Sequence, residues 1–172
     1  GRLSVLVNNA GIVAPSCRVD EMDAARVSRM FAVNVVGSFL CAREAVRRMS
    51  RRHGGSGGSI VNVSSNAIDL PVAGYGAYAI TKAGVAQLTQ TLAHEVGDRG
   101  IRVNAIAPGA TVTAFTQRHL KNPDGSLNQQ AYAGFISKME SLSPIGMVGE
   151  AVDQAWLMLY LASDAGRFCT GQ

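Results

Sequence analysis

The 172-residue chain is 47% hydrophobic and 16% charged, a composition that indicates one globular domain with a buried core and excludes a disordered protein. Sixteen lysines and arginines against 12 acidic residues leave a modest net charge of +4. No apolar run approaches the roughly 20 residues of a membrane span, and the first residues lack the basic-then-apolar pattern of a signal peptide. We therefore expect a cytoplasmic protein without a membrane partner.

The cysteines, histidines and arginines predict neither a metal site nor a nucleic-acid partner. The cysteines are odd in number, widely spaced and without a Cys-x-x-Cys pair, and the histidines are isolated. These residues are Cys17, Cys41, Cys169, His53, His94 and His119. Arginines gather between Arg43 and Arg52, at the end of a predicted helix, where cations complement the helix dipole. No aromatic side chains lie among them for base stacking.

The chain opens on an apolar run of strand length, residues 3–7, followed by a turn of small residues, Asn8-Asn9-Ala10-Gly11. Residues 20–52 have helical periodicity, with a break predicted near Asn34 because its amide can compete with the backbone hydrogen bonds. The predicted apolar face comprises Met22, Met30, Val33, Gly37, Leu40, Cys41, Ala45 and Met49. Residues 54–58 lie between a helix and a following strand, so we expect a flexible connector rather than a phosphate-binding loop.

Further strands are predicted at residues 59–63 and 101–107, with a helix at 77–96 between them. Residues 111–147 form a long, partly polar segment of the kind that often closes over a substrate as a lid. An amphipathic helix is predicted at 150–163, and the residues assigned to one of its faces are Val152, Ala155, Trp156, Leu159 and Tyr160. Strands that alternate with helices predict an α/β fold with a parallel sheet.

Tyr78 and Lys82 are the strongest candidates for chemistry. They stand four residues apart in the helix predicted at 77–96, so both side chains lie on one face, about 5–6 Å apart at Cβ. A free phenol titrates near pH ~10, and a nearby cation favours its ionised form. The pair therefore predicts a tyrosine that can exchange a proton near neutral pH.

Three predicted strand ends carry small or polar residues, at the edge where doubly wound sheets bind ligands. Together with the Tyr/Lys pair they resemble the short-chain dehydrogenase/reductase family. The matching motifs are Asn8-Asn9-Ala10-Gly11, Asn34 in Asn-Val-Val-Gly, Ser65 thirteen positions before Tyr78, Tyr-x-x-x-Lys, and Pro-Gly-x-x-x-Thr from Pro108 to Thr113. The resemblance extends from Gly1 to Gln172 and implies a Rossmann-like, doubly wound parallel sheet in one domain, 1–172.

For catalysis, the resemblance implies an oxidoreductase that interconverts an alcohol and a carbonyl with NAD or NADP. Tyr78 would exchange the proton as hydride moves, and Lys82 would assist it and bind the nicotinamide ribose. Ser65 would hold the substrate oxygen, a preorganised donor typically worth a few kcal/mol. Asn34 would place a water that links Lys82 to solvent.

For the cofactor, the resemblance implies contacts from three segments besides Tyr78 and Lys82. Asn9, Ala10 and Gly11 would pass under the adenosine ribose. Thr111 and Thr113, after Pro108 and Gly109, would meet the nicotinamide carboxamide. Family members also associate as homotetramers or homodimers through two long helices, which correspond to residues of about 33–52 and 77–96 here.

The family pattern also includes a Gly-rich strand-turn-helix at the start and a final strand at the end, and neither is in this sequence. We therefore expect a fragment that contains the catalytic residues but only part of the cofactor site, and that is unstable by itself. A different hypothesis is a truncated, non-catalytic subunit that docks onto complete relatives. A third is an isomerase or dehydratase that uses a bound nicotinamide.

The residues of the predicted lid leave the substrate open. An apolar set would suit a hydrophobic or cyclic alcohol or ketone, and core packing explains it equally well; it comprises Phe115, Tyr132, Phe135, Met139 and Leu142. A polar set would instead suit a sugar or an acyl carrier, and comprises Gln117, Arg118, Asn128 and Gln129.

Overall fold

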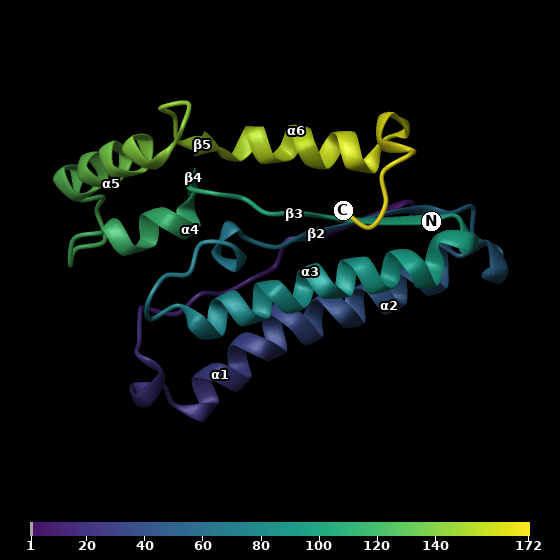
Figure 1. Ribbon diagram of the computed structural model, residues 1–172, viewed down its shortest axis with the longest axis horizontal. Coiled ribbons are helices and arrows are strands. Elements are labelled where there is room, and N and C mark those ends of the chain that lie inside the picture. Colours follow the sequence, from purple (N-terminus) through teal and green to yellow (C-terminus); the bar gives the residue numbers. More distant parts are fainter. Residues whose placement is uncertain (1) are drawn as a thin grey trace. The chain divides into compact units, whose positions relative to one another are not determined.

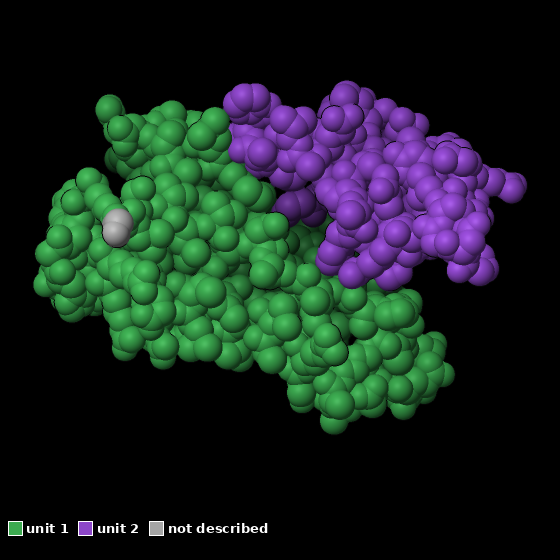
Figure 2. Space-filling model, turned by 180° about the vertical axis from the view of Figure 1, so that it is seen from behind, with its two compact units in different colours: residues 1–107, 157–172 green, residues 108–156 purple. Residues whose placement is uncertain are grey.

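The computed structural model describes residues 2–172; Gly1, where the predicted domain begins, lies outside the described residues. The chain divides into two compact units. The first runs to Ala107 and also includes Leu157–Gln172, and the second is Pro108–Trp156. Figure 2 shows the first unit in green and the second in purple.

The first unit is built on a parallel sheet whose strands are β1 (Val5–Asn8), β2 (Gly58–Val63) and β3 (Ile101–Ile106). Their order is β1-β2-β3, with Asn8 opposite Asn62 and Val63 opposite Ile106. Each strand lies within one or two residues of the bounds predicted at 3–7, 59–63 and 101–107. Parallel neighbours require crossover connections, usually helical, between them. The predicted doubly wound parallel α/β arrangement is confirmed.

Helices cover both faces of this sheet (Figure 1). On one face lie α2 (Ser38–Met49) and α3 (Gly76–Val96), whose small and apolar side chains pack on β2 and β3. That core comprises Ala42, Ala45, Met49, Ile60, Leu92, Ala93, Val96, Ile101 and Val103. On the other face, Leu161 of α6 (Ala151–Ala162) packs with Val61 and Ile106.

The predicted break near Asn34 is a π-helical segment. It spans Ala32–Gly37, between α1 (Ala24–Phe31) and α2, so the helix is continuous but has a wider turn in its middle. Buried residues follow at steps of four, at Met30, Asn34, Ser38 and Ala42. In a regular α-helix each such step would drift by about 40°, and the wider turn reduces that drift.

Two predicted apolar faces are wrong in part. Leu40 and Cys41 of α2 are exposed, because the π-helical segment changes the phase of the helix before they are reached. The face predicted for α6 is exposed as well, with Trp156 65% accessible. The residues of α6 that pack on the sheet are Met158 and Leu161. Bulky apolar residues on both faces of α6 made the buried face ambiguous from sequence.

The second unit contains regular helices and strands where the sequence indicated only a long, partly polar segment. Strands β4 (Thr111–Val112) and β5 (Gly149–Glu150) pair in parallel, and α4 (Ala114–Gln117) and α5 (Gln129–Leu142) lie between them in the chain. The Asn128 side chain accepts a hydrogen bond from the backbone N–H of Ala131 at 2.9 Å and so caps α5. A lid role for residues 111–147 stays a prediction.

Short 3₁₀ turns lie at Val19–Glu21, Arg51–His53, Asn66–Ile68, Gly97–Arg99, Arg118–Leu120 and Asp164–Gly166. None of the helices within residues 2–172 has both the length and the apolar character that a bilayer crossing requires.

Strand β1 is incompletely covered. Val5 and Val7 are 38% and 41% exposed on one face, and among the described residues no strand pairs with the edge of β1 opposite β2. Leu3 and Leu6 line an open groove of about 350 Å³ with Leu40 of α2. An unpaired edge and uncovered apolar side chains favour association with other chains.

We therefore expect the 172-residue chain, expressed by itself, to aggregate or to unfold without a cooperative transition. Burial of apolar area stabilises the folded state by about 25 cal/mol per Å², which offsets the conformational entropy lost when the backbone becomes ordered. Apolar area that stays uncovered makes no such contribution. Size-exclusion chromatography and a thermal melt followed by circular dichroism measure this directly. A soluble monomer with a sharp melting transition would contradict the expectation.

Candidate active site

The candidate residues of the first unit lie around the carboxyl ends of β1 and β2. Asn8 ends β1 and opens the small-residue turn, and Ser64 and Ser65 directly follow β2. The loop after Ser65 leads into α3, which carries Tyr78 and Lys82 in its first two turns. Parallel strands end at one edge of the sheet, so the fold gathers these segments there.

Lys82 is the centre of the site. Its side chain is nearly buried, at 5% exposure, and its Nζ donates to the backbone carbonyl of Val63 at 2.8 Å. The same Nζ lies 5.8 Å from the centroid of the half-buried Tyr78 ring. None of the salt bridges formed by residues 2–172 includes Lys82. Burial of this ammonium lowers the pKa of Lys82 from its ordinary value of 10.5.

Asn34, from the π-helical segment, is 1% exposed and uses its side-chain amide to hold other parts of the site. Its Oδ1 accepts from the backbone N–H of Ile12 at 2.8 Å, and its Nδ2 donates to the Ile12 carbonyl at 2.9 Å. Nδ2 also donates to Thr81 Oγ1 at 3.0 Å. Asn34 thus joins the turn after β1 to α3; its predicted placement of a water stays a prediction.

The two serines after β2 make different contacts. Ser64 is 3% exposed, and its hydroxyl donates to the Lys82 carbonyl at 2.9 Å. Ser65 is 8% exposed and its Oγ accepts from the backbone N–H of Ala67 at 3.2 Å, which begins the 3₁₀ turn at Asn66–Ile68. Because that Oγ is an acceptor there, the Ser65 hydroxyl proton can be offered to another group.

Gly11 passes close to the lysine. A Cβ at this position would lie 3.2 Å from Lys82 Nζ and 3.6 Å from Asn34 Oδ1, so it would crowd the ammonium and make ordinary contact with the amide. Asn9 and Ala10, before it in the turn, are exposed. The predicted passage of Asn9, Ala10 and Gly11 under an adenosine ribose stays a prediction.

The remaining predicted cofactor residues belong to the second unit. Thr111 is 8% exposed, and its hydroxyl donates to the Gly109 carbonyl at 3.2 Å. Thr113 precedes α4 in a capping box with Thr116. Pro108 and Gly109 lead into this turn. Their predicted contacts with a cofactor stay predictions.

Sequence reasoning placed Ser64 near the site without a role, and it missed Thr81 as the partner of Asn34. The available signal for Thr81 was its position on the buried side of α3, because a buried hydroxyl must find a hydrogen-bond partner. Across residues 2–172, no three His, Cys, Asp or Glu side chains are grouped so as to hold a metal ion.

The chain is similar to known proteins over nearly its whole length. Residues 1–172 match the family model described as "Enoyl-(Acyl carrier protein) reductase". The chain is 40% identical over 170 residues to the "Uncharacterized oxidoreductase YgfF" of Escherichia coli (strain K12), covering 98% of this chain and 64% of that protein. It is 33% identical over 169 residues to the "NADPH-dependent aldehyde reductase 2, chloroplastic" of Arabidopsis thaliana, covering 98% of this chain and 57% of that protein.

A solved structure is similar as well. The structure titled "ElxO with NADP Bound" superposes with a TM-score of 0.83 at 30% identity, over 99% of this chain and 64% of that one. The chain therefore spans about two thirds of the length of these proteins, or less. Because a family model matches residues 1–172 and these relatives are up to 40% identical over nearly the whole chain, the chain belongs to the short-chain dehydrogenase/reductase family.

Proposed function

We propose that the protein is an NAD(P)-dependent oxidoreductase that interconverts an alcohol and a carbonyl, with Tyr78 as the proton donor and acceptor. The observation that carries this proposal is the buried Lys82 ammonium, 5.8 Å from the Tyr78 ring centroid and without a carboxylate partner among the described salt bridges. A buried charge is costly to fold, and such groups concentrate at functional sites.

In the proposed reaction, the Tyr78 hydroxyl gives its proton to a carbonyl oxygen, or takes one from a hydroxyl. The Lys82 charge stabilises the phenolate that remains, since opposite charges attract strongly where water is excluded. The Ser65 hydroxyl donates to the same substrate oxygen and stabilises the charge that develops on it. Asn34 holds the turn after β1 in place through Ile12.

The residues present fit the nicotinamide end of such a cofactor. An ammonium has three donors, and the Val63 carbonyl uses one of those of Lys82. Gly11 leaves the space beside that ammonium without a side chain. In this proposal Lys82 binds the ribose hydroxyls, Asn9–Gly11 approach the adenosine ribose, and Thr111 and Thr113 meet the carboxamide. A bound nicotinamide supplies the hydride.

Isotope transfer tests the proposal. The protein as its gene encodes it is incubated with 4-nitrobenzaldehyde, or another simple aldehyde or ketone from a panel, and with NADH or NADPH deuterated at the reactive carbon. We expect deuterium on the carbinol carbon of the alcohol product, because the proposed reaction moves the hydride directly. An isomerase or dehydratase would give no net transfer. Cofactor binding without turnover of any panel member would favour the non-catalytic subunit.

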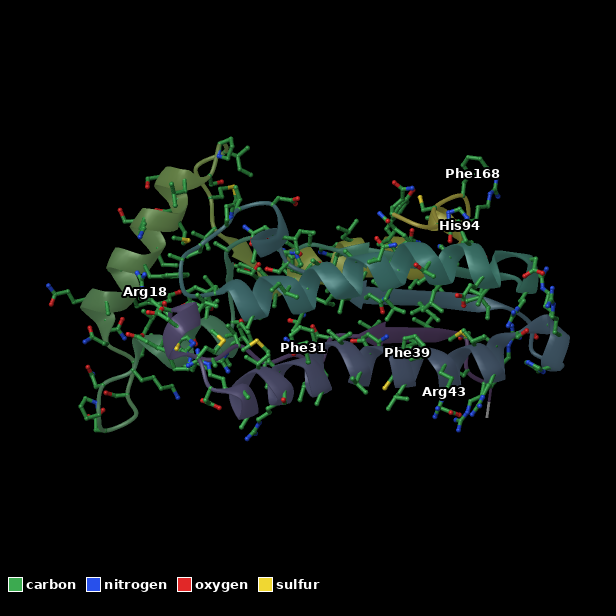
Figure 3. All side chains as sticks on the ribbon, turned by 60° about the horizontal axis from the view of Figure 1, so that its bottom comes forward. Arg18, Phe31, Phe39, Arg43, His94 and Phe168 are labelled. Atoms are coloured by element: carbon green, nitrogen blue, oxygen red, sulfur yellow. The ribbon has the colours of Figure 1, made fainter. Side chains whose placement is uncertain are left out.

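We also propose that the protein forms a homodimer or homotetramer through α2 and α3, and that it works in the cytoplasm, where its free cysteines stay reduced. Apolar side chains are exposed on both helices, with Phe39 at 53% and Ile80 at 60%. Phe39 and Arg43 of α2 (Figure 3) line a groove of about 290 Å³ together with Leu92 and Glu95 of α3. Apolar and charged groups of both signs suit a self-complementary interface.

Phe39→Glu is expected to reduce the oligomer to a smaller species, because the new carboxylate would be buried against an apolar partner surface. Light scattering after size-exclusion chromatography measures the mass. Val19→Glu is the matched control, since Val19 is a 90% exposed apolar residue outside both helices. An unchanged mass for Phe39→Glu would remove α2 from the interface.

A further inference from the structure

Thr81 lies inside the candidate site and has no exposed surface. Its hydroxyl has two hydrogen-bond partners, Asn34 Nδ2 at 3.0 Å and the Tyr78 carbonyl at 2.7 Å. The amide NH₂ of Asn34 can only donate and a carbonyl can only accept, so the direction of both bonds is fixed. Thr81 accepts from Asn34 and donates to Tyr78.

These bonds form one path through three elements. Ile12, in the turn after β1, is held through both its N–H and its carbonyl by Asn34 of the π-helical segment. Asn34 donates to Thr81, and Thr81 donates to the backbone of the residue that carries the phenol. The next turn of α3 is held too, because the Ser64 hydroxyl donates to the Lys82 carbonyl.

We propose that Thr81 is a positioning residue of the reaction, which fixes the turn of α3 carrying Tyr78 and Lys82 against the turn after β1. This inference rests on the proposed function and deepens it. Thr81 itself touches backbone and Asn34, so its effect on turnover is exerted through the placement of Tyr78. Displacement of a reacting group by about 1 Å can cost up to 10²-fold in rate.

The same helix contains a matched residue away from the site. Thr89 is 1% exposed, accepts from Asn62 Nδ2 at 2.8 Å and donates to the Val85 carbonyl at 2.9 Å. Its local chemistry therefore repeats that of Thr81, two turns further along α3. Loss of its hydroxyl leaves an asparagine NH₂ without one partner, as at Thr81, but breaks no bond to Tyr78.

The experiment compares Thr81→Val, Thr81→Ser and Thr89→Val in the protein as its gene encodes it, with 4-nitrobenzaldehyde as the probe. We expect Thr81→Val to lower kcat by about 10–10²-fold, with KM and cofactor affinity nearly unchanged. Thr81→Ser should restore kcat, because it keeps the hydroxyl. Thr89→Val should lower the melting temperature by a similar amount and leave kcat unchanged. Equal loss of kcat in both valine variants, or no rescue by serine, would overturn the proposal.

Hydrogen exchange of the amides at residues 79–82 adds a measurement that needs no turnover. We expect about tenfold faster exchange in Thr81→Val than in Thr89→Val, the effect of one lost net hydrogen bond. Unchanged exchange there would overturn the inference whether or not the enzyme is active. If exchange is faster in Thr81→Val but the unaltered protein turns over no probe, the positioning role of Thr81 stands and the proposed oxidoreductase activity is contradicted. If Thr81→Val does not fold, Thr81→Cys, of similar size to serine and a weak donor, replaces it.

Discussion

Replacement of Tyr78 by phenylalanine is expected to lower kcat by about 10²–10⁴-fold, the usual contribution of general acid–base catalysis. Phenylalanine keeps the ring that lies 5.8 Å from Lys82 Nζ and removes only the hydroxyl. The half-buried packing of the ring should therefore persist, and cofactor affinity should stay within about twofold. Steady-state kinetics with the carbonyl probe, and titration of NADPH by fluorescence, measure the two quantities separately.

Tyr160→Phe is the matched control for this variant. Tyr160 lies on α6 with its hydroxyl 3.6 Å from Cys169 Sγ, so this substitution removes a phenol hydroxyl outside the site. The kcat of Tyr160→Phe should equal that of the unaltered protein. Turnover by Tyr78→Phe at the rate of Tyr160→Phe would exclude Tyr78 as the proton donor.

Lys82→Met is expected to lower kcat by about 10²-fold or more, because the charge that stabilises a phenolate is lost. The melting temperature at neutral pH should fall much less than this loss of kcat would suggest if Lys82 were mainly structural. Methionine fills a similar space, and the buried ammonium that it replaces opposes folding, although the bond to the Val63 carbonyl is lost. Loss of activity without a matching loss of stability would show that the Lys82 charge serves the reaction and not the stability of the fold.

The pH dependence of the unfolding free energy provides a second, independent test of Lys82→Met. Burial lowers the pKa of Lys82 below 10.5, so the native state releases its proton at a lower pH than the unfolded state does. Between those two values the unfolded state holds more protons, and stability attributable to Lys82 rises with pH. The unfolding free energy of the unaltered protein minus that of Lys82→Met should therefore be flat below the native-state pKa of Lys82 and increase from there toward pH 10.5.

Lys138→Met, at an exposed position of α5, controls for the loss of a lysine. Denaturant unfolding at a series of pH values provides the free energies. A difference that falls with rising pH would mean that the site stabilises the ammonium, contrary to what its burial implies.

The strands and the α3 helix could be predicted because their signals are local. Each strand is an apolar run bounded by turn residues, and α3 is long and begins and ends at glycines. The buried face of α2 could not be predicted fully, since the π-helical segment before it departs from the 3.6-residue period on which the argument depends. Helix α5 was missed because its sequence is only weakly amphipathic, although Asn128 is a recognisable cap.

For the site, motif order placed Asn34, Ser65, Tyr78 and Lys82 in one region, and the described contacts of Asn34, Tyr78 and Lys82 lie there. The burial of Lys82 against the Val63 carbonyl was not predictable, because it depends on how α3 packs on β2. The bridge through Thr81 depends on an asparagine 47 residues away in the chain. Contacts of that kind have no local signal.

The π-helical segment also takes up one residue of chain length. Its wider turn lets the six residues Ala32–Gly37 rotate the helix about as far as five residues of a regular α-helix would. Removal of one residue from this segment would therefore let α1 and α2 continue as one regular α-helix, with Met30 and Ala42 still on the buried side. Removal of one residue within α2 itself has no such compensation and would rotate the residues beyond it by about 100°, so that Met49 would leave the sheet. Natural variation in chain length should therefore fall in the π-helical segment or in loops such as the glycine-rich connector at residues 54–58, and not in α2.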